Sequence, residues 1–97
     1  MPNNVTTAAG IVVDLFDAVA ATGISKLVSI QAKDKVLQVI MTGTATVVLA
    51  GSNDGVNWVT IGSVTASGKI SDSDPWLYSR AQITAYTSGV VSAFLAY

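Results

Sequence analysis

The sequence has 97 residues, enough for one domain with a modest core. It contains no cysteine, histidine or glutamate, which excludes disulfide bonds and catalysis by a thiolate or an imidazole. Five basic and six acidic residues give a net charge of −1, so the chain lacks the basic patch that nucleic-acid binding requires.

The charged fraction is low, at 11% against about 25% in ordinary soluble domains. Such a surface is typical of a chain that enters a membrane or contacts other proteins over much of its area. The uncharged run over residues 36–53 includes Gln38, Ser52 and Asn53, which makes it too polar for a membrane-spanning helix. No basic segment precedes the first apolar run, so no signal peptide is expected. We therefore expect a protein made in the cytoplasm that works in an assembly, without membrane or nucleic-acid partners.

The first ten residues, MPNNVTTAAG, are small and polar and have no periodicity. They predict an extended N-terminal arm over residues 1–10 that docks on a neighbouring subunit, followed by one domain over residues 11–97. Residues 11–22 have apolar spacings that fit both a helix and a strand. Their β-branched start favours the strand.

The next segment, residues 24–31, alternates in polarity and predicts a strand that ends at a charged turn. Lys26, Lys33 and Lys35 surround this turn, with only Asp34 against them. We interpret these lysines as a solvated rim, because three are too few for a phosphate-binding surface.

Two hairpins are predicted in the middle of the chain. Residues 35–41 (KVLQVIM) and 44–50 (TATVVLA) are predicted to form the first one, joined at Gly43-Thr44. A second tight turn follows, because Gly55 can adopt a positive φ without steric cost. This turn consists of Asn53, Asp54 and Gly55.

The remaining strands are predicted at residues 57–64, 69–71, 76–86 and 90–97. A loop over residues 71–75 contains Asp72 and Asp74, which are expected to cap the turn by binding their own backbone. Seven to eight short strands with turns between them, and no crossover helices, predict an all-β fold. The expected architecture is a small antiparallel β-sandwich of the jelly-roll or immunoglobulin-like type. Residues 35–41 and 90–97 are apolar on both faces, so some outward faces are expected to contact other subunits.

Catalytic constellations are absent from the sequence, and we expect a protein that is not an enzyme and has no cofactor. We expect no metal site, and Asp54, Asp72 and Asp74 are the candidate ligands if one exists. They could contribute to a calcium site, which needs six to eight oxygens, only if their two loops met.

The two tryptophans each follow a polar turn. Trp58 and Trp76 are predicted to begin a strand and to cover one end of the core, where the indole N–H reaches a loop carbonyl. The alternative is a platform for sugar binding beside Asn53 and Asp54, which would make the chain a glycan-binding adhesion module.

Two stretches carry a resemblance to a known family. TATVVLAGSNDGVNWVTIGSVTASG (residues 44–68) and PWLYSRAQITAYTSGVVSAFLAY (residues 75–97) resemble small β-sandwich proteins encoded among the head genes of tailed bacteriophages. LFDAVAATGISKLVSI (residues 15–30) is a looser match. The resemblance implies a virion structural protein, in the first place a capsid decoration (cement) protein, with a tail or fibre subunit as the alternative.

The resemblance also implies partners and a place of action. It implies a homo-oligomer, with a trimer favoured, that contacts the major capsid protein or another virion protein and is located in the virion. The residues expected at the partner interface come from the arm and the last strand. They are Met1, Pro2, Asn3, Asn4, Val5, Val90, Phe94 and Tyr97.

Overall fold

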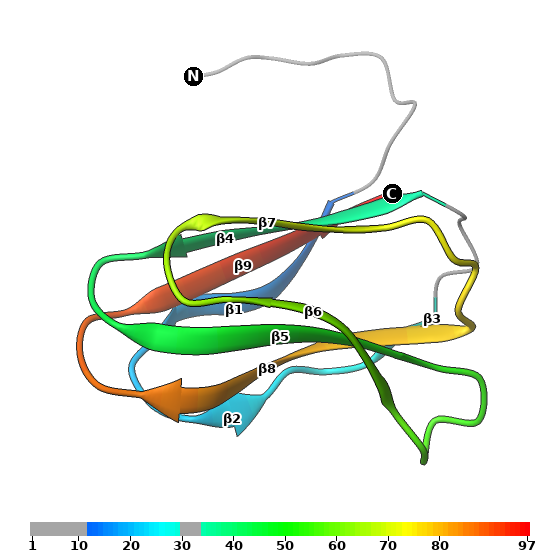
Figure 1. Ribbon diagram of the computed structural model, residues 1–97, viewed down its shortest axis with the longest axis horizontal. Helices are drawn as coiled ribbons and strands as arrows, with labels where there is room; N and C mark the ends of the chain where they lie inside the picture. Colours follow the sequence, from blue (N-terminus) through cyan, green and yellow to red (C-terminus); the bar gives the residue numbers. More distant parts are fainter. Residues whose placement is uncertain (1–11, 30–33) are drawn as a thin grey trace.

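The computed structural model describes residues 12–29 and 34–97, and the predicted arm over residues 1–10 lies outside this part of the chain. The described residues form two packed antiparallel sheets and no helix, which confirms the predicted all-β sandwich (Figure 1). The strands are β1 (Val12–Val19), β2 (Gly23–Ile24), β3 (Val28–Ser29), β4 (Lys35–Met41), β5 (Ala45–Ser52), β6 (Val59–Val64), β7 (Gly68–Asp72), β8 (Tyr78–Tyr86) and β9 (Val91–Ala96).

The strand order identifies the sandwich as a jelly roll. Sheet A has the order β1-β9-β4-β7, and sheet B has the order β2-β8-β5-β6, with β3 also paired to β8. β2 and β3 pair with different parts of β8, so they occupy one interrupted edge position. The first strand therefore pairs with the last, β2 and β3 with β8, β4 with β7, and β5 with β6. This pattern is one long antiparallel ribbon folded over itself, which defines a jelly roll. Of the two predicted types, jelly-roll and immunoglobulin-like, the structure has the first.

The core lies between the two sheets and follows the alternation of the strands. Every second residue of the central strands points inward, as expected for strands with one buried face. In β1 both Leu15 and Phe16 are buried, because a bulge after Asp14 turns two successive side chains to the core. The other buried members of the core are Leu37, Val39, Ala45, Val47, Leu49, Ile70, Ala81, Ile83, Val91, Ala93 and Leu95.

The prediction that residues 35–41 and 44–50 form a hairpin is wrong. β4 belongs to sheet A, between β9 and β7, whereas β5 belongs to sheet B, between β8 and β6. The connection between them therefore crosses from one sheet to the other. Alternation shows which side chains face the core, but it does not show whether the next strand is a neighbour in the same sheet or lies across the core.

A second crossing runs beside the first and is bonded to it. The Thr42 N–H donates to the Val90 carbonyl at 3.1 Å, and the Thr44 N–H donates to the Ser88 carbonyl at 3.1 Å. Gly43 and Gly89 lie between these bonds with their backbones in contact, and a Cβ on either glycine would overlap backbone atoms of the opposite crossing. Gly89 also has a φ of 82°. The ribbon can turn between the sheets here because neither residue has a side chain.

Three smaller corrections concern the loops. One strand was predicted over residues 24–31, but the structure, which describes this segment up to residue 29, has two short strands there, β2 and β3. The second hairpin is confirmed as β5–β6, but its loop spans six residues, 53–58, instead of a tight turn. β8 begins at Tyr78 and not at Trp76, because Pro75 and the two residues after it belong to the loop.

We expect Gly89→Ala to lower the free energy of unfolding by about 2–4 kcal/mol, because the methyl group meets the Gly43 backbone and the residue must keep a positive φ. Urea denaturation measures this change. Gly68→Ala is the matched control, since its new Cβ has no neighbour closer than 3.9 Å. Equal effects of the two substitutions would show that the crossing is not closely packed.

Candidate functional site

The β5–β6 loop, residues 53–58, is organised by two side chains. The buried Ser52 hydroxyl accepts the N–H groups of Asp54 at 3.2 Å and Gly55 at 2.9 Å, and it donates to Asp54 Oδ1 at 2.9 Å. Asp54 Oδ1 also accepts the N–H groups of Val56 and Asn57, each at 2.8 Å. Asn57 Nδ2 donates to Asp54 Oδ2 at 2.8 Å. Gly55 has a φ of 76°, as the predicted turn requires.

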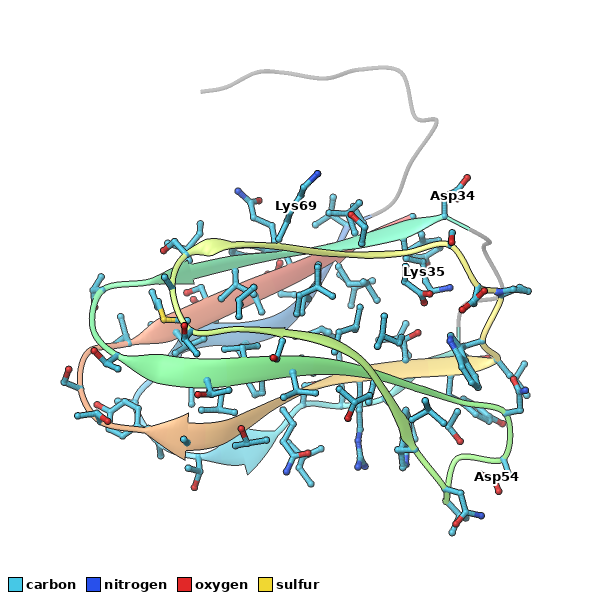
Figure 2. The ribbon with its side chains drawn as sticks, viewed as in Figure 1. Asp34, Lys35, Asp54 and Lys69 are labelled. Atoms are coloured by element: carbon cyan, nitrogen blue, oxygen red, sulfur yellow. The ribbon has the colours of Figure 1, made fainter. Side chains whose placement is uncertain are left out.

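These hydrogen bonds determine the charge state of Asp54. The backbone N–H groups of Asn57 and Val56 hold the pKa of this carboxyl well below its usual value, and the Asn57 side chain and the Ser52 hydroxyl lower it further. The carboxylate is thus occupied by its own loop, although the residue itself is exposed (Figure 2). Its chemistry is that of a turn cap.

We expect Asp54→Asn to lower the melting temperature at pH 7, with the difference from the wild type disappearing on acidification. The lowered pKa means that the stabilisation is complete above the usual aspartate pKa, about 4, and is lost as the pH falls toward the lowered value. Thermal denaturation between pH 7 and pH 2 tests this dependence. Asp74→Asn is the control, since the Asp74 carboxylate makes no hydrogen bond within the described residues. A pH-independent difference for Asp54→Asn would contradict the assignment.

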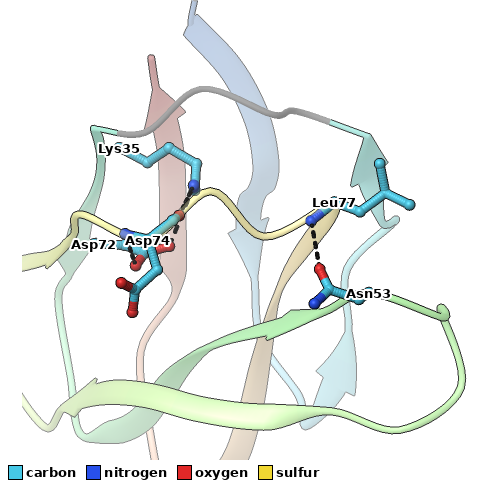
Figure 3. A network of polar contacts seen from close by, with 5 residues as sticks. All are labelled: Lys35, Asn53, Asp72, Asp74 and Leu77. Carbon is cyan, nitrogen blue, oxygen red and sulfur yellow. Dashed lines mark hydrogen bonds and ion pairs between the residues drawn. The ribbon is translucent and has the colours of Figure 1, made fainter.

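The β7–β8 loop, residues 73–77, is tied to β4 and to the neighbouring loop (Figure 3). Asp72 Oδ1 accepts the N–H of Asp74 at 3.0 Å, which confirms the predicted cap for Asp72. The prediction is wrong for the Asp74 carboxylate, which makes no hydrogen bond within the described residues. Lys35 Nζ lies 3.3 Å from Asp72 Oδ2 and donates to the Asp74 carbonyl at 2.6 Å. The Leu77 N–H donates to Asn53 Oδ1 at 3.1 Å. The two loops at this end of the sandwich therefore form one connected structure.

Lys35 and Asp72 form a buried ion pair. They lie opposite each other in the register of β4 and β7, and their side chains are 0% and 1% exposed. The prediction of a solvated rim is wrong for Lys35, which points between the sheets (Figure 2). The sequence did contain a signal for this position, because Lys35 is in phase with Leu37 and Val39 on the inward face of the strand.

Removing one partner of this pair is expected to be costly. Lys35→Met leaves a buried carboxylate without its cation, and it should lower the free energy of unfolding by about 3–5 kcal/mol. The double variant Lys35→Met with Asp72→Leu should cost less than either single substitution, since no unpaired buried charge remains. Urea denaturation of both single variants and the double variant measures the coupling. Additive losses would show that the two groups do not depend on each other.

The candidate metal ligands do not come together. Asp54 is occupied by its own loop, Asp72 by Lys35 and the Asp74 backbone, and the Asp74 side chain is exposed. Among the residues that the structure describes, no group of three histidine, cysteine or acidic side chains could hold a metal ion. The condition for a calcium site, that the two loops bring these carboxylates together, is not met: Asp54 caps its own turn, Asp72 pairs with Lys35, and the Asp74 carboxylate is exposed.

The two tryptophans lie in different places. Trp58 is half-buried and has the Arg80 guanidinium 4.1 Å from its ring centroid, a cation–π contact. Arg80 belongs to the outward-facing set of β8, so Trp58 lies outside sheet B and does not cover the core, which corrects the prediction. Trp76 packs against the buried Gly51 at the end of β5, but its Nε1 has no partner within the described residues. Because Arg80 covers one face of Trp58, that face is closed to stacking by a sugar.

The outer face of sheet A brings three exposed apolar side chains together. Val12 is 63% exposed, Ile40 46% and Val36 39%, and they surround a hollow of about 640 Å³. We call this surface the A face. It is lined by Val12, Val36, Gln38, Val39, Ile40, Ser67, Gly68, Lys69, Phe94 and Ala96. Exposed apolar surface gathered on one face is typical of a protein–protein contact site.

The predicted interface residues are divided between this face and other places. Phe94 lies on the A face, whereas Tyr97 packs against the core and Val90 belongs to the crossing beside Thr42. The predicted interface residues of the arm, Met1, Pro2, Asn3, Asn4 and Val5, lie outside the described residues. Sequence reasoning identified the two-sided apolar strands but missed Val12 and Lys69, because their position on the A face depends on which strands are neighbours.

Comparisons with known proteins identify the fold. No protein-family model and no curated protein sequence matches the chain. The structure is similar to that of the SPBc2 prophage-derived protein YomS, with a TM-score of 0.69, 7% identity, and coverage of 96% of this chain and 98% of the other. It is also similar to a chain of Bacillus endospore appendages, which form a family of disulfide-linked pili, with a TM-score of 0.52, 16% identity, and coverage of 97% and 94%. At these identities the likeness establishes the fold alone. No helix that could span a membrane occurs in residues 12–29 and 34–97.

Proposed function

We propose that the chain is a non-enzymatic structural protein of a phage-derived particle, and that it works as a capsid decoration (cement) protein. In this role it bridges neighbouring subunits of the shell. The observation that carries the proposal is the A face, an exposed apolar surface on a chain in which only 11% of the residues are charged. The shared fold of a prophage-derived protein, over nearly the whole length of both chains, supports it.

The mechanism of such a protein is mechanical. Each contact removes apolar surface from water, which contributes about 25 cal/mol per Å² before the costs of association. A single small contact is weak, but many identical copies on a regular shell act together and add up to strong reinforcement. The side chains of Val12, Val36 and Ile40 are already ordered on strands, so little conformational freedom is lost when they are covered.

The arm is proposed to contribute the second contact. In this hypothesis residues 1–10 add as a strand to an edge of a neighbouring shell subunit, which supplies backbone hydrogen bonds. Deleting residues 1–10 is expected to weaken binding to purified particles about tenfold or more, as measured by co-sedimentation. Replacing the same ten residues by a glycine-serine segment of equal length is the control for spacing. If the shortened chain binds as well as the full chain, the arm has no such role. If the full chain does not bind particles, the decoration function is wrong.

A second candidate function is a subunit of a filament, as in a tail or fibre. The observation that favours it is the likeness to the endospore appendage chain. The 97 residues contain no cysteine, so filament contacts of this chain would be non-covalent. Electron microscopy separates the two candidates, because filaments in a concentrated solution of the pure protein support the second one, and dispersed protein that binds particles supports the first.

A further inference from the structure

The register of sheet A arranges the outward side chains of the A face in rows across its four strands. One row is Val12, Ala96, Val36 and Ser71, from β1 through β9 and β4 to β7. The next row is Asp14, Phe94, Gln38 and Lys69. The interior of these two rows is thus apolar or uncharged, and their two charges, Asp14 and Lys69, lie in the same row, whereas the exposed Asp17 of β1 lies beyond both rows.

These two charges have opposite signs and lie on opposite edges of the sheet. Asp14 is exposed on edge strand β1, and Lys69 is exposed on edge strand β7, where it points away from the core (Figure 2). Three strand spacings separate them, about 14 Å, so they do not meet within one chain. Among the residues that the structure describes, neither forms an ion pair.

We propose that the A face is a contact between two copies of this chain, related by a two-fold axis parallel to the strands between β9 and β4. This axis exchanges the two edges of the sheet when a second copy is laid face to face on the first. Asp14 of one copy then faces Lys69 of the other, and the symmetry forms this pair twice. Phe94 faces Gln38 of the other copy, and Ala96 faces Val36.

The charges select this axis over the alternative. A two-fold axis perpendicular to the strands, through the charged row, would place Asp14 against Asp14 and Lys69 against Lys69. Like charges in direct opposition disfavour that arrangement. The apolar interior of the A face provides attraction in either arrangement, so the edge charges determine the orientation.

The size of the face sets the strength of the contact. Four strands of about seven residues cover about 19 by 23 Å, or roughly 900 Å² for both copies together. This area is smaller than that of most stable dimers, so we expect a dissociation constant in the micromolar range or weaker. The contact does not depend on a particle. Its test uses the isolated protein. A dimer would cover the A face with a second copy and leave the proposed arm contact to bind the shell, whereas a failed test leaves the A face available to a shell subunit and the decoration function unaffected.

The first experiment exchanges the two charges and measures the mass by sedimentation over a concentration series. Asp14→Lys and Lys69→Asp each place like charges in opposition twice, so each should weaken dimerisation about tenfold or more. The double variant D14K/K69D restores opposite pairs and should dimerise within about threefold of the wild type. Lys26→Asp, on the connection between β2 and β3 beside sheet B, should have no effect. A double variant as weak as the single ones would overturn the proposed axis.

The second experiment covers the apolar part of the face. Val36→Asp places a charge against Ala96 of the other copy and should abolish dimerisation, while the same change at Val56, 77% exposed in the β5–β6 loop, should not. Circular dichroism shows whether each variant keeps its fold. A folded Val36→Asp variant that dimerises normally would show that the A face is not the contact.

The third experiment tests the geometry directly and uses the absence of natural cysteines. Asp14→Cys and Lys69→Cys proteins are prepared separately, mixed, and treated with a bis-maleimide of about 8 Å span. Positions 14 and 69 face each other across about 10 Å, the usual separation of packed sheets, whereas identical positions lie about 17 Å apart. The mixture should give far more cross-linked dimer than either protein alone. Equal cross-linking in all three samples would contradict the arrangement.

Other occupants of the A face predict different results. If the A face is instead a site for the chain's own arm or for a shell protein, the isolated wild-type protein stays monomeric at millimolar concentration. That result overturns the proposal. A mass of three copies, the oligomer that the sequence resemblance favours, overturns the two-fold contact as well. Only a concentration-dependent dimer with the charge dependence described above supports it.

Discussion

The close contact between Gly43 and Gly89 is the constraint on which the fold depends most. At this point two connections cross side by side from one sheet to the other, and their backbones are held together by the bonds of Thr42 and Thr44. A ribbon that turns such a corner must bring its two backbones together without side chains between them. The pairing of β4 with β9 on one side, and of β5 with β8 on the other, continues directly from this corner.

The opposite end of the sandwich is held by polar contacts. Lys35 and Asp72 take part in the β4–β7 ladder with buried side chains, and through the Asp74 carbonyl they fix the start of the β7–β8 loop. Asn53 then connects this loop to the β5–β6 loop through the Leu77 N–H. Buried ion pairs contribute less to net stability than to selecting one arrangement, because desolvation offsets much of their attraction. In this chain the pair removes two charged side chains, Lys35 and Asp72, from a surface that already has few charges.

Alternation and turn chemistry in the sequence were sufficient to predict the strands and the all-β sandwich. The positive φ of Gly55 and the Asp72 cap were predicted for the right physical reasons. The hairpin at Gly43 was predicted wrongly, because period-2 alternation is the same for a strand beside its predecessor and one across the core. Lys35 was predicted at the surface because its charge was given more weight than its position in the inward-facing alternation of the strand. Trp58 was predicted to cover the core because its contact with Arg80 joins residues far apart in the sequence, which the sequence pattern does not show.

Assembly through a face, in preference to an edge, is consistent with how the edges of the sheets are built. β1 carries two register irregularities and an Ala18 with a φ of 52°, which bend it away from the straight strand that edge pairing needs. In sheet B, the edge formed by β2 and β3 is interrupted between these two strands, where Lys26 is exposed. β7 is short and carries the exposed Lys69. Devices of this kind block uncontrolled strand addition, whereas the centre of the A face carries no charge to prevent contact. Asp14, Asp17, Lys26 and Lys69 therefore lie where they limit edge pairing, and the uncharged centre of the A face is left available for a specific partner.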